Sequence, residues 1–266
     1  MGNASTPLAD QSALLKIERA GPVLSIGLNR PAKRNALNDG IMLAIQECFS
    51  ALPETTGAVV IHGIGDHFSS GLDLSELTEH DATEGLRHSQ MWHRVFDRIQ
   101  YSRVPVIAAL KGAVIGGGLE LACAAHIRVA EPSAYFALPE GQRGIFVGGG
   151  GSVRLPRLIG VARMTDMMLT GRVYSATEGA SYGFSQYLTE QGGALPKAME
   201  LATRIASNAP LTNFAVLQAL PMIAEANPQT GLLMESLMAT VAQSDKEAKR
   251  RIRAFLERKT AKVKPS

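Results

Sequence analysis

The segment Gly116-Gly117-Gly118-Leu119-Glu120 places three glycines and a carboxylate between two apolar stretches. Residues 104–110 before it predict a strand, and residues 119–125 predict the start of a helix. The first amides of a helix lack intrahelical acceptors, and the helix dipole favours negative charge beside them. The segment therefore predicts a place that stabilises an oxyanion, with Glu120 within reach. Taken alone, the same residues also fit a tight turn whose Glu only interacts with the dipole.

The sequence around this segment alternates between strand and helix patterns. A hairpin is predicted at residues 14–29 around Gly21-Pro22, and a helix is predicted to begin after Asn38, a favourable N-cap. Further strands are expected at residues 58–62, 104–110, 127–130 and 133–136, with the second of these entering the glycine turn directly, and further helices near Asp73 and around Trp92. Beyond Gly148-Gly149-Gly150-Gly151 the pattern is helical nearly to the end. Such alternation predicts an α/β fold with largely parallel sheets.

Composition indicates an ordinary globular protein, because 45% of the 266 residues are hydrophobic and 19% are charged. Cys48 and Cys123 are too few for a disulfide framework, which favours a reducing compartment. Residues 1–10 lack the basic start and apolar core of a signal peptide, and no apolar run is long enough to cross a bilayer. We therefore expect a cytoplasmic protein with no membrane partner.

Positive charge is concentrated at one end: residues 246–264 carry nine basic and two acidic side chains, although the whole chain has a net charge of +3. Nucleic-acid binding is one interpretation, but no interleaved aromatic residues or known module accompany the charge, so we expect no nucleic-acid partner. A nucleotide-dependent oxidoreductase is a second alternative. It fits poorly because the chain has no phosphate-binding Gly-Lys-Ser/Thr motif, and residues 148–151 do not follow the strand of a βαβ unit. The six histidines show no metal-ligand spacing, so no metal is expected.

Six fragments in a fixed order resemble the crotonase (enoyl-CoA hydratase/isomerase) superfamily. They are Leu28-Asn29-Arg30-Pro31, Asn35-Ala36-Leu37, Phe68-Ser69-Ser70-Gly71-Leu72-Asp73, residues 112–120, Pro139-Glu140 and Ala254-Phe255-Leu256-Glu257-Arg258-Lys259. The resemblance implies a spiral of repeated ββα units at residues 1–200. It also implies a helical region at residues 201–266 that oligomerises, giving a homotrimer or a hexamer built from two trimers.

The resemblance also implies a site and a reaction. Backbone amides of Leu72 and Gly117 would hold the thioester oxygen of an acyl-CoA substrate, while Glu120 and Glu140 would transfer protons and the backbone of Gly148 would help to position water. Members with both acids generally hydrate, which implies syn addition of water to a trans-2-enoyl-CoA to give a 3-hydroxyacyl-CoA. An enoyl-CoA isomerase, which would need only Glu140, and other acyl-CoA lyases or hydrolases of the superfamily remain alternatives.

The coenzyme A moiety is the only cofactor-like group that the resemblance implies, and the substrate carries it. Its binding residues would be Ala32, Lys33, Arg34, Ser70, Leu72, Phe255 and Arg258, the last two on a neighbouring subunit. Two departures from the family pattern accompany these matches. Phe146-Val147-Gly148 replaces a proline-containing stretch after the second acid, and Arg250-Arg251 replaces Glu-Gly before the C-terminal match.

Overall fold

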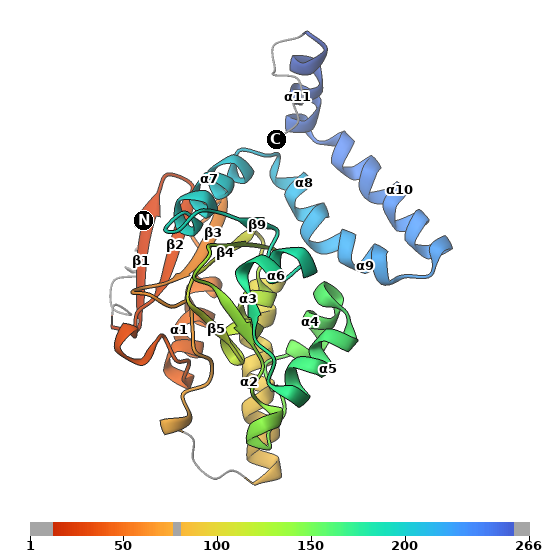
Figure 1. The fold of residues 1–266 in the computed structure, drawn as a ribbon. Helices are drawn as coiled ribbons and strands as arrows, with labels where there is room; N and C mark the ends of the chain where they lie inside the picture. Colours follow the sequence, from red (N-terminus) through yellow and green to blue (C-terminus); the bar gives the residue numbers. More distant parts are fainter. Residues whose placement is uncertain (1–12, 77–80, 258–266) are drawn as a thin grey trace. The chain divides into compact units, whose positions relative to one another are not determined.

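The computed structural model describes residues 13–76 and 81–257, which form two compact units that divide between Ala206 and Ser207 (Figure 1). The division follows α7 (Ala194–Ala206), so the predicted boundary at residue 200 falls inside a helix. Each unit is described by itself below.

The first unit is built on a six-stranded sheet. Its strands, in spatial order, are β1 (Leu15–Ala20), β2 (Val23–Leu28), β3 (Ala58–Gly63), β4 (Val106–Leu110), β6 (Ile127–Ala130) and β9 (Tyr187–Leu188). The first two strands form the predicted antiparallel hairpin, and all the later pairings are parallel. Parallel neighbours need long crossovers, and these supply the rest of the unit.

A second layer of short segments accompanies this sheet. It contains β5 (Ala113–Ile115), β7 (Tyr135–Ala137) and β8 (Tyr174–Ser175), and single bridges from Ser69 to Val114 and from Leu37 to Leu72 extend it. Each turn of the chain therefore adds a strand to the large sheet and then a short segment to the second layer. This is the repeated unit that the resemblance implied.

The sequence prediction was wrong about the glycine turn, which does not follow the strand of the large sheet directly. The chain first reverses at Lys111-Gly112, where Gly112 has φ +52°, and then forms β5 before the glycines. Three-residue β5, like two-residue β8 and β9, is too short to show a hydrophobic period in sequence.

Helices pack on both faces of the large sheet. The helices of the first unit, in chain order, are α1 (Asp39–Ser50), α2 (Ala82–Gln100), α3 (Gly117–Ala124), α4 (Gly151–Ile159), α5 (Val161–Thr170), α6 (Ala176–Tyr182) and α7, with short turns η2 (Pro31–Lys33), η3 (Leu74–Glu76) and η4 (Gly141–Arg143). Alternate residues of β3 explain the two faces: Val60 packs against α7, whereas Val59 and Ile61 join the core formed with α1 and α2 (Figure 1). Asn38 caps α1 as predicted, since its side chain accepts a hydrogen bond from the amide of Ile41.

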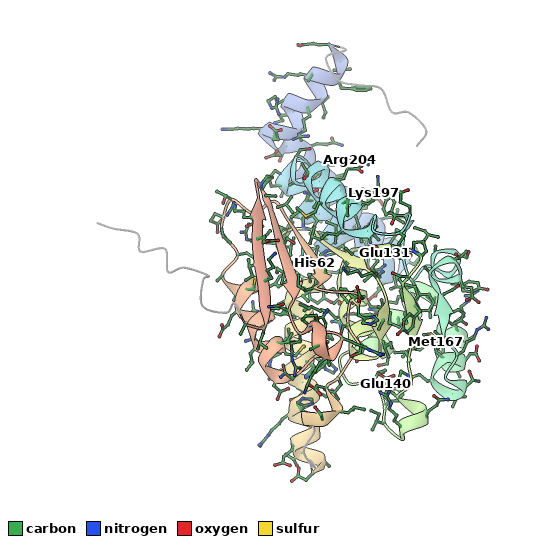
Figure 2. The ribbon with its side chains drawn as sticks, turned by 60° about the vertical axis from the view of Figure 1, so that its left-hand side comes forward. His62, Glu131, Glu140, Met167, Lys197 and Arg204 are labelled. Carbon is green, nitrogen blue, oxygen red and sulfur yellow. The ribbon has the colours of Figure 1, made fainter. Side chains whose placement is uncertain are left out.

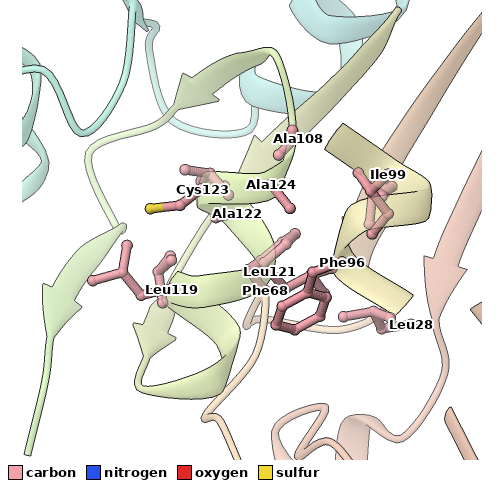
Figure 3. Close-up of a cluster of buried hydrophobic side chains, with 14 of the residues drawn as sticks. Leu28, Phe68, Phe96, Ile99, Ala108, Leu119, Leu121, Ala122, Cys123 and Ala124 are labelled. Carbon is pink, nitrogen blue, oxygen red and sulfur yellow. The ribbon is translucent and has the colours of Figure 1, made fainter. Parts of the chain in front are cut away.

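Helix α3 lies inside the core rather than on its surface. All eight of its residues are buried, and Leu119 and Leu121 belong to the same cluster as Phe68 and Phe96 (Figure 3). A helix that is apolar on every side is stable only when it is surrounded by protein. Its position, and with it that of Glu120, is therefore fixed by packing from all directions.

The second unit is helical. It contains α8 (Pro210–Phe214), the π-helical turn η5 (Ala215–Ala219), α9 (Leu220–Glu225), α10 (Pro228–Ser244) and α11 (Lys246–Leu256). Many large apolar side chains of this unit are exposed, among them Phe214, Leu220, Met222, Leu232, Leu233 and Leu237.

Among the described helices of both units, none combines the length and apolar character needed to cross a membrane. Cys48 and Cys123 are free and buried, and burial raises the pKa of each thiol to about 11.

Buried Arg128 on β6 stabilises the end of α3. Its Nη1 donates to the carbonyl of Ala125, the C-cap of α3, at 2.7 Å, and its Nε donates to the carbonyl of Phe184 at 2.9 Å. Replacing Arg128 with Met would leave both buried carbonyls without these donors, so we expect a loss of about 3 kcal/mol in the free energy of unfolding. Urea unfolding at pH 7 measures this loss. The exposed control Arg94→Met on α2 should change stability by less than about 0.5 kcal/mol, and an equally small change for Arg128→Met would contradict this role.

Candidate active site

A cavity of about 420 Å³ opens where three neighbouring segments of the second layer end. These segments are residues 69–72, β5 and β7, and the residues that follow them include the predicted Leu72, Gly117 and Glu140. The cavity is lined by Ser70, Gly71, Leu72, Leu74, Gly85, His88, Ser89, Trp92, Ile115, Gly116, Gly117, Glu120, Glu140, Arg143, Ile145, Phe146, Val147, Gly148 and Gly149. The structure thus brings both predicted acids and both predicted amides to one cavity.

The amides of Leu72 and Gly117 lie close together with no acceptor. In its bridge with residue 72, Leu37 bonds to the carbonyl of Gly71 and the amide of Asp73, which leaves the amide of Leu72 outside the bridge. Gly117 begins α3, where amides have no intrahelical partner. Within the described ranges neither amide donates a hydrogen bond, and a Cβ built on Gly117 would lie 3.5 Å from the Leu72 nitrogen.

Glycine is required where these segments approach each other. Gly71 has φ +87°, and a Cβ there would lie 2.6 Å from the carbonyl oxygen of Ile115 and 3.2 Å from the Gly117 nitrogen. Gly116 has φ +52°, and a Cβ there would lie 2.6 Å from Oε1 of Glu140. Side chains at either position would push the amides or the acid apart.

Glu120 is buried and held by backbone. Its Oε1 accepts hydrogen bonds from the amides of Gly149, at 2.9 Å, and Gly151, at 2.7 Å. Burial raises the pKa of Glu120 to about 7; the Glu140 carboxylate adds to the rise, while the two amides and Arg154 oppose it. Both amides bind Oε1. The other oxygen, Oε2, accepts no hydrogen bond from the described residues.

Glu140 follows β7 and stands immediately before η4. Its Oε2 is buried and has no hydrogen-bond partner among the described residues. Burial raises the pKa of its carboxyl, while the residue's own backbone amide and the charge of Arg143 oppose the rise. A buried carboxyl without donors favours its neutral, protonated form. The two acids therefore differ in environment, since two loop amides hold one oxygen of Glu120, whereas Oε2 of Glu140 has no donor among the described residues.

The loop at residues 146–151 replaces the family's proline-containing stretch, yet side chains hold it in place. The Ser89 hydroxyl donates to the carbonyl of Gly148 at 2.7 Å, and Arg154 donates to that of Gly149 at 2.9 Å. Gly148, which the sequence predicted to help position water, lines the cavity, whereas the amides that reach Glu120 belong to Gly149 and Gly151. Sequence reasoning missed these contacts. Arg154 could have indicated these contacts from the sequence, because it is a charged residue on the apolar face of α4 and a buried charge requires internal partners.

The predicted coenzyme A residues on the first unit lie along one rim. Ala32 and Lys33 are in η2, and the hydroxyl of Ser70 donates to the carbonyl of Lys33 at 3.3 Å. Arg34 has a left-handed backbone, φ +50°, and its carbonyl accepts from the amide of Ser70 at 3.0 Å. These bonds bring the predicted residues 32–34 beside Ser70 and Leu72.

Asp73 fixes the basic side chains of this rim. It pairs with Arg30 at 2.9 Å and Lys33 at 3.0 Å, and the Ser75 hydroxyl, followed by these cations, holds the pKa of its carboxyl well below its usual range. Lys33 therefore has an internal partner as well as its predicted role toward phosphate.

The C-terminal predictions fall in the second unit. Phe255 is exposed on α11, and Arg258 lies outside the described residues. Arg250 and Arg251, the second departure, both bind Glu247, whose pKa is lowered to about 2 chiefly by the hydrogen bond from Arg250. Part of the local basic charge is thus neutralised within α11.

Aromatic and aliphatic side chains line the remainder of the cavity. The indole of Trp92 packs edge-on against Phe96 and donates to His88 at 3.2 Å, and a Cβ on Gly117 would lie 2.9 Å from its ring. Phe146 is largely exposed at the cavity, and Phe96 lies behind Trp92 rather than in the lining. Trp92 therefore adjoins the free amides.

A second hollow, of about 520 Å³, lies at the carboxyl ends of β3, β4 and β6 and is lined by His62 and Glu131 among others. Both oxygens of Glu131 are occupied, by Ser133 and Gln191 on Oε1 and by the Gly192 amide on Oε2. Figure 2 shows Glu140 well below His62 and Glu131 in that view. Glu131 therefore acts as an internal support for the loop at residues 190–193.

No group of three or more His, Cys, Asp or Glu side chains in the described ranges is arranged to hold a metal ion.

Comparison with known proteins identifies the family of the chain. The model of the enoyl-CoA hydratase/isomerase family matches residues 18–265. The chain is 34% identical to 2,3-dehydroadipyl-CoA hydratase of Escherichia coli, covering 94% of this chain and 98% of that protein, and 31% identical to short-chain-enoyl-CoA hydratase of Clostridium acetobutylicum, covering 91% and 94%.

Solved structures show the same fold. A Rhodopseudomonas palustris protein provisionally described as an enoyl-CoA hydratase is 78% identical, with a TM-score of 0.92, 97% of this chain covered and 100% of that one. Enoyl-CoA hydratase from Bacillus anthracis is 31% identical, with a TM-score of 0.86 and coverage of 92% and 96%. The chain therefore belongs to the enoyl-CoA hydratase/isomerase family and has the crotonase fold that its motifs predicted.

Proposed function

We propose that this enzyme is an enoyl-CoA hydratase that adds water in the syn sense to a trans-2-enoyl-CoA and releases a 3-hydroxyacyl-CoA. One observation carries the proposal: two buried carboxyls in different environments share a cavity with two unoccupied backbone amides. The names of the relatives support hydration as the reaction.

In the proposed reaction the thioester oxygen accepts hydrogen bonds from the amides of Leu72 and Gly117. These bonds stabilise the negative charge that develops on the oxygen and make C3 electrophilic. The oxyanion is held by backbone, so the side chain at residue 72 is free to vary.

Glu120 acts as the base and Glu140 as the acid. Glu120, ionised and held through Oε1, takes a proton from water through Oε2 while the water oxygen bonds to C3. Glu140, protonated, gives its proton to C2 as the enolate electrons return. Both elements of water are then on the substrate, and a proton passes from Glu120 back to Glu140, by way of solvent, before the next turnover. The two groups titrate as a coupled pair.

The remaining proposals follow from the same reaction. Coenzyme A, carried by the substrate, lies along residues 32–34 and Ser70, with Phe255 and Arg258 contributed by a neighbouring subunit, and no further cofactor or metal takes part. Gly148 borders the water position. Assembly into homotrimers or hexamers is supported by the exposed apolar side chains of the second unit.

Glu140→Gln tests the acid of the proposed hydration, and the choice of substrate separates the hydratase from the isomerase alternative. Glutamine fits the same space but has no acidic proton to give to C2, so hydration of crotonyl-CoA, followed as loss of enoyl absorbance, should fall at least about a hundredfold. The wild-type enzyme should hydrate crotonyl-CoA and should not move the double bond of a 3-enoyl-CoA. Rapid movement of that double bond to position 2 without hydration would establish the isomerase instead.

A further inference from the structure

Arg154 on α4 is the most fully engaged cation around the site, although it lies outside the cavity lining. Its side chain is 8% exposed. Nη2 binds Asp97 at 2.6 Å and Nε binds the side-chain oxygen of Gln100 at 2.5 Å, both on α2. Nη1 donates to the carbonyl of Gly149 at 2.9 Å. The guanidinium thus joins α2 and α4 to the loop that holds Glu120.

Three consecutive peptide groups of this loop are each fixed through their carbonyl. Ser89 holds the carbonyl of Gly148, Arg154 holds that of Gly149, and the amides of Val153 and Arg154 donate to that of Gly150. The first and third of these peptides supply the amides that bind Glu120, namely those of Gly149 and Gly151. The Arg154 side chain fixes the peptide between them.

Arg154 and Glu120 pack tightly against the glycines of this loop. Gly150 has φ +91°, and a Cβ there would lie 2.3 Å from Nη1 of Arg154. Cβ atoms on Gly149 and Gly151 would meet Glu120 at 3.1 and 2.8 Å. The guanidinium and the carboxylate therefore lie close against one stretch of backbone that carries no side chains.

We propose that Arg154 is a positioning residue for Glu120: it locks the peptide between Gly149 and Gly150 so that two amides converge on one carboxylate oxygen and leave the other facing the cavity. The inference rests on the role of Glu120 in the proposed function. It adds a residue that touches neither substrate nor reacting atoms and acts through the glycine loop.

Two consequences distinguish positioning from a purely structural role. Loss of the guanidinium frees the middle peptide and weakens both amide bonds to Oε1, and it removes a positive charge that lowers the pKa of Glu120. Both changes favour the protonated acid, so the pKa of Glu120 should rise in the variant. Loss of fold stability alone would leave this pKa unchanged.

The test is a titration of Glu120 by carbon-13 NMR of side-chain carboxyls in the full-length protein, assigned with Glu120→Gln. In Arg154→Gln the Glu120 pKa should rise by about one unit. In Arg154→Lys, which keeps the charge but loses the planar set of donors, the pKa should rise by less. With crotonyl-CoA, kcat at pH 7 should fall about tenfold or more in Arg154→Gln with KM nearly unchanged, and the acidic limb of the pH profile should move with the titration.

Arg163→Gln is the matched control, because Arg163 also donates to a helix carbonyl, that of Ile159 at 2.8 Å, away from the cavity. It should leave the titration unchanged. An unaltered Glu120 pKa in folded Arg154→Gln would overturn the proposal. Should Arg154→Gln not fold, Gln100→Leu, which removes the neutral acceptor of Nε and changes no charge, must raise the Glu120 pKa, or the proposal fails. The titration needs no turnover, so inactivity toward every enoyl-CoA would refute the hydratase function and leave the role of Arg154 separately tested.

Discussion

Glu120→Gln should lower kcat for hydration of crotonyl-CoA by about a thousandfold while the protein folds normally. The glutamine carbonyl can still accept from the amides of Gly149 and Gly151, but the side chain can no longer take a proton from water. In the wild type, kcat should fall about tenfold per pH unit below pH 7, because the pKa of Glu120 is raised to about 7 and only the ionised form is a base. Near-normal hydration by the variant would refute the role of Glu120.

Stability should change with pH in a way that identifies the same residue. Burial raises the native pKa of Glu120 from 4.5 to about 7, so between these values the native protein binds more protons than the unfolded chain. The free energy of unfolding therefore decreases as pH rises through this window, by up to about 3 kcal/mol. Glu120→Gln should lose this dependence and be more stable than the wild type at pH 8. Urea unfolding at pH 5 and 8 measures both, and parallel behaviour of the two proteins would contradict the raised pKa.

Gly117→Pro should lower hydration a hundredfold to a thousandfold relative to Gly117→Ala. Gly117 is the first residue of α3, a position that tolerates proline, and Gly116 has ψ −125°, away from the helical region that proline disfavours in its predecessor. Proline removes the amide hydrogen proposed to bind the thioester oxygen, and one such donor is worth about that factor in rate.

Gly117→Ala is the control because both variants introduce a Cβ that meets Trp92 at 2.9 Å, whereas only alanine keeps the amide. Should that contact lower activity in both, the pair is compared in a Trp92→Leu background. Equal kcat/KM values for the proline and alanine variants would show that the Gly117 amide does not stabilise the transition state.

Much of the fold and the site could be predicted from the sequence because the deciding signals are local. The hairpin of β1 and β2 followed from alternation around a Gly-Pro turn, and α1 from Asn38 and the apolar spacing after it. The glycine segment pointed to Gly117 and Glu120, but a tight turn fitted the same residues, and the resemblance to the family decided between the two interpretations. Their roles remain predictions that the variants above test.

The parts that were missed depend on contacts between distant residues. Short β5 escaped notice because its pairing partners are at Ser69 and β7, and three residues carry too little pattern. The hydrogen bonds from Gly149 and Gly151 to Glu120 join segments thirty residues apart, and no local propensity encodes them. The link from Asp97 through Arg154 to this loop has the same origin.

The bridge between Ser69 and Val114 has a consequence for how such enzymes diversify. It ties together the two chain segments that lead to Leu72 and Gly117, and it does so through main-chain atoms alone. The distance between the two amides is therefore set by main-chain pairing and depends little on which side chains lie nearby. Substitutions at Trp92, Ile145 or Phe146 should therefore reshape the cavity without moving the two amides that we propose to hold the carbonyl oxygen, so one main-chain frame would suit many acyl groups.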